Sequence, residues 1–373
     1  MKLIRILFAL CALALSGALI AGCGGDDDGG SSDADPQTVL ENTFNNDTKV
    51  SSGNLTISVN VDAQGDEGGS FEGSLSGPFQ GDPDNAAAIP MLDWTAEASG
   101  DIAGQSLDFE GGLVITEDNA FIEYGDKAYE IGSDQFAPLK EQLESQAGAA
   151  NNEDSPASFK AACSQALKQA GATDTKVCDV DFTSWLTNLT NEGTEDVGGA
   201  ESVHVHGDAN LDRVLEDVGN FAAAIPAASA QGFNPAQLQL LEGMIDSASI
   251  DVYSTTDDNL LSKLQLNLGI DLAGIPESER GGVEKVDVTF GFEIAEINEE
   301  QSVEAPGDAE PIDSLLGDLG IDLGQLGQLG GVPEIQPRGD KKGGGKQPNA
   351  DAYLECIQQA QTADAINECA SEL

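Results

Sequence analysis

The sequence has few positively charged residues. Lys and Arg together number 16 against 66 Asp and Glu, which gives 373 residues a formal net charge of −50. A nucleic-acid partner is excluded, because phosphate contacts need clustered Lys and Arg. Adhesion to an anionic membrane surface through a basic patch is excluded for the same reason.

Side chains and motifs of catalysis are also scarce. The chain has only two histidines, its aromatic content is 5%, and it lacks the GxSxG, HExxH and GxGxxG patterns. His204 and His206 lie two residues apart on an expected strand and so share a side, but no third metal ligand is evident. We interpret them as exposed strand histidines, and we expect no enzymatic activity, no cofactor and no metal site.

The N-terminus has the pattern of a secretory signal. Lys2 and Arg5 precede the apolar run 6–15, which is shorter than the about 20 residues that a bilayer span needs. The residues at 20–23, Ile-Ala-Gly-Cys, look like a bacterial lipobox, in which Cys23 receives a diacylglyceryl group and becomes the new N-terminus. We therefore expect residues 1–22 to be removed. The mature protein would be anchored to the outer face of the cytoplasmic membrane.

Residues 23–36 are predicted to form a lipidated acidic tether. The segment is rich in Gly, Ser and Asp and carries no bulky apolar side chain. Such composition is typical of a flexible, extended linker. A metal site in its Asp cluster is disfavoured, because nothing rigid holds the carboxylates together.

The other cysteines of the mature chain suggest disulfides. Cys163, Cys178, Cys356 and Cys369 form an even set, as expected for an oxidising compartment. Short spacing favours Cys163 with Cys178 and Cys356 with Cys369. A four-cysteine metal site is disfavoured, because the sequence has no CxxC pair.

Hydrophobic periodicity predicts an α+β fold with one large antiparallel sheet and helices against one face. Leu55, Ile57, Val59 and Val61 alternate with polar residues, as in a half-buried strand. Strands are predicted around 55–61, 70–76, 92–98, 106–115, 120–124, 127–131, 201–209, 248–252, 264–270 and 286–294. Helices are predicted over 37–46, 135–147, 156–170, 211–221 and 235–245.

Two segments carry a family resemblance. The order of elements, with Asn119–Ile131 and Val197–Gly207, resembles the LppX/LprG-type envelope lipoproteins of actinobacteria. The resemblance covers roughly residues 36–306 and places a lipid-binding domain at 37–310. It implies the LolA-like fold, a strongly curved half-barrel with helices on its concave face lining an apolar lipid cavity.

The apolar stripes of the strands supply the candidate cavity residues. These are Leu55, Ile57, Val59, Val61, Leu264, Leu266, Leu268, Val286, Val288, Phe290 and Phe292. The resemblance implies a non-enzymatic lipoprotein that binds or carries an acyl-chain lipid. The alternative is an envelope sensor or interaction lipoprotein with a protein partner and no transported ligand. A continuous apolar cavity favours the first, and a collapsed core favours the second.

The C-terminal end departs from that family. Residues 311–348 form a Leu/Gly-rich segment and linker, in which 315–331 is compatible with a short amphipathic helix. Residues 349–373 are predicted to form a small helical hairpin pinned by Cys356 and Cys369. No role follows from their sequence.

Overall fold

The computed structural model describes residues 33–46, 48–83, 85, 88–102, 105–150, 176–178, 180–224 and 242–318. All belong to one unit, Met1–Leu319. The signal peptide, Cys23, the helix expected over 156–170 and the hairpin expected over 349–373 lie outside the described residues.

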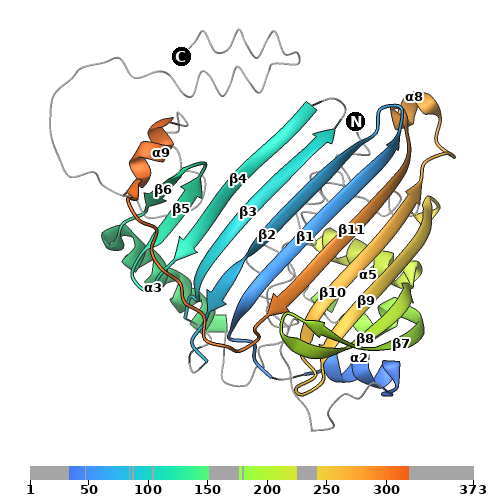
Figure 1. Ribbon diagram of the computed structural model, residues 1–373, viewed down its shortest axis with the longest axis horizontal. Helices are drawn as coiled ribbons and strands as arrows, with labels where there is room; N and C mark the ends of the chain where they lie inside the picture. The colour runs from blue at the N-terminus through green and yellow to red at the C-terminus, as the bar shows by residue number, and fades with distance from the viewer. Residues whose placement is uncertain are drawn as a thin grey trace. The chain divides into compact units, whose positions relative to one another are not determined.

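A sheet of 12 strands dominates the described part of the chain (Figure 1). Its strands are β1 (Ser52–Gly65), β2 (Gly69–Gln80), β3 (Met91–Ile102), β4 (Gln105–Ile115), β5 (Ala120–Tyr124), β6 (Lys127–Glu130), β7 (Leu186–Val197), β8 (Ala200–Ala209), β9 (Ile245–Thr255), β10 (Leu261–Asp271), β11 (Val283–Ala295) and β12 (Glu310–Pro311). The helices are α2 (Pro36–Phe44), α3 (Ser133–Ala150), α5 (Leu211–Ala224), α8 (Glu277–Arg280) and α9 (Ile312–Asp318), with 3-10 turns η1 (Lys176–Cys178) and η2 (Phe182–Trp185).

Two meanders meet in the middle of this sheet. The strand order is β12-β6-β5-β4-β3-β2-β1-β11-β10-β9-β8-β7. Neighbouring strands are antiparallel, except that β12 runs parallel to β6. The N-terminal meander β1–β6 and the later meander β7–β11 are joined by the pairing of β1 with β11, in which Ile57 lies opposite Phe292. The expected α+β class with one large sheet is confirmed.

Some expected elements differ in detail. The sequence does not predict β7, because this segment is polar and lacks a clean alternation. Two register shifts interrupt the pairing of β7 with β8. The sequence predicts Ile245 at the end of a helix, but in the structure this residue begins β9. The short β12 and α9 extend the sheet region beyond residue 310, and Lys127 on β6 forms an ion pair with Glu310 at 3.0 Å.

Helix α2 begins where the sequence provides a start signal. Asp35 accepts a hydrogen bond from the backbone N–H of Thr38 at 3.1 Å, and Pro36 occupies the first turn. Val39 and Leu40 are buried against Val203, Val205 and Val252 of the sheet. α2 therefore covers the β8–β9 end of one face.

Candidate functional site

Alternation gives most of the sheet one apolar face and one polar face, although Val114 and Phe121 on β4 and β5 are buried on the polar side. Ile57 on β1 pairs with Phe292 on β11, which pairs with Leu264 on β10. Cross-strand partners point to the same side of a sheet, so this register continues one apolar face across the strands. The predicted cavity residues that share the face are Leu55, Ile57, Val59, Val61, Leu264, Leu266, Leu268, Val286, Val288, Phe290 and Phe292. Their role in ligand binding stays a prediction.

Burial differs along the apolar face. Leu55, Ile57 and Phe292 form a core cluster with exposed fractions of 2%, 1% and 8%. Trp94 and Leu75 of the neighbouring strands are partly buried against it. Part of the predicted stripe is therefore core packing in the described structure.

An apolar pocket of about 440 Å³ lies further along the same face. It is lined by Ala88, Ile89, Pro90, Leu113, Ile115, Ala120, Ile131, Phe136, Leu139 and Leu143. Leu113 and Leu143 remain 37% and 44% exposed, which places them where the pocket meets its surroundings. All of the lining side chains are uncharged.

Polar contacts hold helix α3 over this pocket. The backbone N–H of Ile89 donates to Glu144 Oε1 at 3.3 Å. Lys140 Nζ donates to the carbonyl of Glu117 at 2.7 Å and lies 4.0 Å from Glu144 Oε1. The side chain of Lys140 is therefore engaged outside the apolar lining.

The sequence prediction included the helix but missed its place in the site. Phe136, Leu139 and Leu143 follow helical spacing and put three apolar side chains on one face of α3. That spacing was the available signal. It could not say which strands the helix would cover, because the contact with Leu113 on β4 is tertiary.

The apolar face continues beyond the pocket with exposed side chains. Leu107, Phe109 and Tyr124 are 45%, 43% and 47% exposed. The ring of Phe109 lies over Gly111, where an added Cβ would be 3.0 Å from Phe109 Cζ. Phe109 and Tyr124 have ring centroids 6.3 Å apart. This end of the face is therefore less covered than the β8–β9 end.

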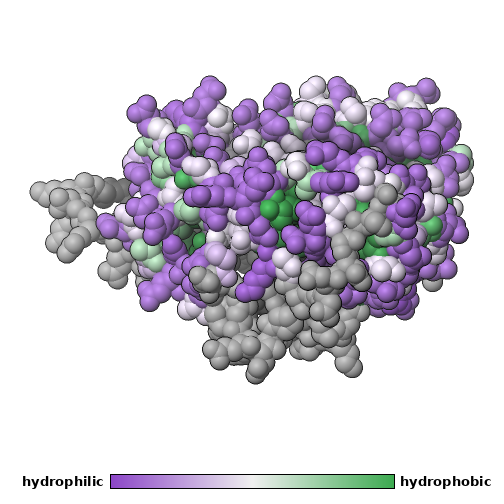
Figure 2. All heavy atoms as spheres, turned by 60° about the horizontal axis from the view of Figure 1, so that its bottom comes forward, coloured by the Kyte–Doolittle hydropathy of each residue, from purple (hydrophilic) through white to green (hydrophobic). Residues whose placement is uncertain are grey.

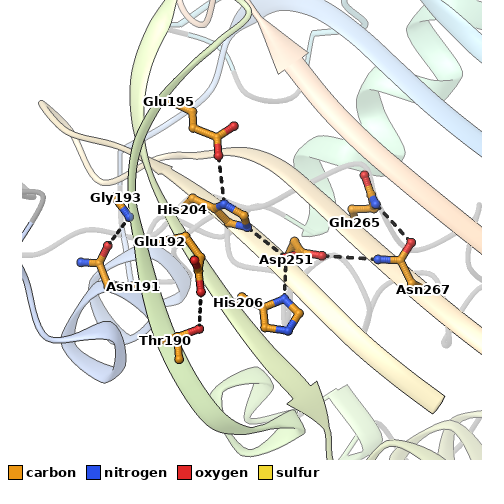
Figure 3. Close-up of polar contacts among 10 residues, drawn as sticks. All are labelled: Thr190, Asn191, Glu192, Gly193, Glu195, His204, His206, Asp251, Gln265 and Asn267. Carbon is orange, nitrogen blue, oxygen red and sulfur yellow. Dashed lines mark hydrogen bonds and ion pairs between the residues drawn. The ribbon is translucent and has the colours of Figure 1, made fainter.

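The opposite, polar face carries both histidines (Figure 3). Asp251 Oδ1 lies 2.9 Å from His204 Nε2 and 2.8 Å from His206 Nδ1, and Glu195 Oε1 lies 3.1 Å from His204 Nδ1. The expected shared side is confirmed. The interpretation as exposed histidines is wrong for His204, whose side chain is 13% exposed, because Glu195 and Asp251 flank it and Tyr253 stacks on it.

The histidine cluster extends into a polar network. Asn267 Nδ2 donates to Asp251 Oδ2 at 3.3 Å, and Gln265 donates to Asn267 (Figure 3). Tyr253 stacks on His204 with ring centroids 4.3 Å apart. Burial, followed by the charges of Glu195 and Asp251, raises the pKa of Tyr253 to about 12. Tyr253 therefore stays a neutral phenol at physiological pH.

A polar hollow of about 460 Å³ lies on the same face, between Asp208, Asp246, Asn267 and Asp287. Lys285 Nζ lies 3.1 Å from Asp287 Oδ1, and this hydrogen bond is the main cause that raises the pKa of Lys285. The carboxylates and amide that line this hollow do not suit an acyl chain. Hydrophilic residues also dominate the surface seen in Figure 2, with small hydrophobic patches among them.

No group of three or more His, Cys, Asp or Glu side chains suited to a metal ion occurs among the described residues. None of the described helices is long and apolar enough to cross a membrane. Cys178 is 1% exposed and disulfide-bonded. Its predicted partner Cys163 lies outside the described residues, so that pairing stays a prediction.

Comparisons with known proteins return solved structures alone. No family model matches the chain, and no curated protein matches it. The crystal structure of LprF from Mycobacterium bovis is similar at 10% identity and a TM-score of 0.31, over 74% of this chain and 99% of that one. The Mycobacterium tuberculosis lipoprotein LppX is similar at 14% identity and a TM-score of 0.23, over 68% and 90% of the two chains. LppX is one of the two proteins after which the family resembled by the sequence is named.

Glu123 tests whether burial and neighbouring carboxylates on the polar face make a negative charge unfavourable there. Its carboxylate lies over Gly112, where an added Cβ would be 2.6 Å from Glu123 Oε2. Burial raises the pKa of Glu123 above its ordinary 4.5, and the charges of Asp93 and Glu110 raise it further. The folded chain therefore binds this proton more tightly than the unfolded chain. Stability contributed by the protonated form is lost as pH rises through the folded pKa.

We expect Glu123→Gln to raise the melting temperature near pH 7 by about one or two degrees and to leave it unchanged near pH 3. Thermal denaturation followed by circular dichroism at both pH values measures this. Glu117→Gln is the control, because Glu117 is exposed at the β4–β5 turn. Equal effects of Glu123→Gln at the two pH values would contradict the assignment.

Proposed function

We propose that this chain is a non-enzymatic, membrane-anchored envelope lipoprotein that binds or carries an acyl-chain lipid. The observation that carries the proposal is the uncharged pocket of about 440 Å³ between α3 and strands β4 and β5. The apolar face that contains it continues through Leu55 and Phe292 to β10. In this proposal the sheet is the curved half-barrel that the family resemblance implies, with α2 and α3 on its concave side.

Acyl-chain burial is sufficient to drive binding. Each CH₂ group transferred from water contributes about 0.8 kcal/mol, so ten of them contribute about 8 kcal/mol before the cost of association. The exposed Leu113 and Leu143 give the chain a route into the pocket. No chemical step is required of any side chain.

The bound head group is neutral in this proposal. The sequence contains no Lys or Arg between Val50 and Asp126, and Lys140 is engaged with Glu117 and Glu144. An anionic head group would find no cation along β1–β5 and would be repelled by a chain of net charge −50. A neutral head group at the pocket mouth avoids both costs.

The substitution Leu113→Trp tests the pocket. Leu113→Trp places a larger side chain against the lining and should lower lipid loading about tenfold, because excluding two CH₂ groups removes about 1.6 kcal/mol of burial. Mass spectrometry of the chain purified without detergent and then offered a diacylglycerol measures the loading. The matched control is Leu107→Trp, because Leu107 lies on the same strand and face, is 45% exposed, and does not line the pocket.

Equal loss of loading in both variants would contradict the assignment of this pocket. A native chain that carries no lipid and takes up none would overturn the proposed function. The sensor or interaction lipoprotein without a transported ligand would then remain.

Membrane anchoring through Cys23 is a separate part of the proposal. The lipobox pattern predicts that Cys23→Ser leaves the chain without its covalent diacylglyceryl group and releases it from membranes. Detergent-phase partitioning and intact mass measure this, with Cys11→Ser as the control, because Cys11 lies in the segment that is removed. An unchanged membrane fraction and an unchanged mass for Cys23→Ser would refute the anchor.

The C-terminal helical hairpin over 349–373, with Cys356 paired to Cys369, is a further part of the proposal.

A further inference from the structure

One polar group on the apolar face has no partner. The indole N–H of Trp94 on β3 is buried, and it has no hydrogen-bond partner in the described structure. Buried tryptophan N–H groups normally find an acceptor, because leaving the donor unpaired costs as much as removing it from water. An orphan donor inside an apolar surface therefore calls for an acceptor from outside the chain.

The strand register places this indole beside the proposed lipid pocket. Trp94 pairs with Leu113 across β3 and β4, and Leu113 lines the pocket. On its other side Trp94 packs against the cluster of Leu55, Ile57 and Phe292. Gly77 of β2 comes close here, since a Cβ at that position would be 3.1 Å from Trp94 Cα. Trp94 thus lies between the pocket and the central apolar stripe.

The surroundings select the kind of acceptor. A carboxylate would be buried without a cation, because the sequence has no Lys or Arg between Val50 and Asp126. The carboxylates of Asp93 on β3 and Glu123 on β5 lie on the other face of the sheet and add repulsion. A plain hydrocarbon offers no acceptor. A neutral acyl carbonyl combines an acceptor oxygen with the chain that the pocket accommodates.

We propose that Trp94 recognises the ester carbonyl of an acyl lipid by donating its indole N–H to the carbonyl oxygen. This inference rests on the proposed function, and it names the ligand class as ester-linked rather than ether-linked lipid. The donor is out of contact with water. Neighbouring side chains therefore shift to admit the carbonyl oxygen, and the bond then supplies the acceptor that the indole N–H lacks. The acyl chain then extends past Leu113 into the pocket.

The test compares two probes that differ only in their carbonyls. A diacylglycerol and the dialkylglycerol of the same chain length are titrated into the full mature chain, and dissociation constants are measured by native mass spectrometry. The native chain should bind the ester about tenfold more tightly than the ether. Trp94→Phe retains an aromatic ring but removes the N–H, and it should bring this ratio close to one.

The matched control is Trp185→Phe. Trp185 Nε1 already donates to Asp217 Oδ2 at 2.9 Å, so this variant should keep the preference for the ester. Equal binding of ester and ether by the native chain would overturn the inference and leave the proposed function standing. A preference that survives in Trp94→Phe would also overturn it. Binding of neither probe would overturn the proposed function itself.

A second measurement works on the native chain if Trp94→Phe fails to fold. The sequence contains two tryptophans, so a ¹⁵N-labelled chain gives two indole N–H resonances, which Trp185→Phe assigns. The diacylglycerol should move the Trp94 proton resonance downfield, and the dialkylglycerol should not. Identical shifts with both probes would contradict recognition of the carbonyl.

Discussion

The pairing of β1 with β11 is the constraint on which the rest of the sheet depends. These strands come from opposite ends of the described chain, and their register sets Leu55 opposite Ile294 and Ile57 opposite Phe292. A slip of one residue would turn the apolar side chains of one strand onto the polar face. Each further strand of a meander pairs with the one before it, outward from β1 or from β11. The β1–β11 register therefore aligns the apolar face from β4 to β8. The buried cluster around Ile57 is therefore the reference for the pocket beyond it.

The two faces serve different physical requirements. The polar face distributes carboxylates toward solvent, and a few are held by local contacts, as Asp251 is by His204 and His206 (Figure 3). Burial and the repulsion of neighbouring carboxylates together raise the pKa of Glu123 on this face. The apolar face is covered by α2 at one end and by α3 near the other, and between β2 and β5 it keeps exposed side chains such as Phe109. Such a surface is costly in water unless something apolar covers it.

Much of this architecture follows from local sequence. The alternation in β1 and β11 is strong enough to predict both strands and the face that they bury, and Asp35 with Pro36 predicts the start of α2. β7 escapes such reasoning, because it is a polar terminal strand with register shifts around Asn188, whose φ is 53°. The site depends more on tertiary contacts.

The acceptors around His204 come from β7 and β9, and the pocket forms only when α3 meets β4. An unpaired indole N–H cannot be predicted from sequence either, because the fold sets its neighbours.

Photolabelling tests most directly the central claim that the apolar face beside α3 holds the acyl chain. The chain is loaded with a diacylglycerol carrying a diazirine near the chain end, illuminated, and mapped by peptide mass spectrometry. The account predicts labels on the peptides that contain Leu113 and Leu139, whereas labels confined to polar-face residues such as Asp246 and Asp287 would contradict it.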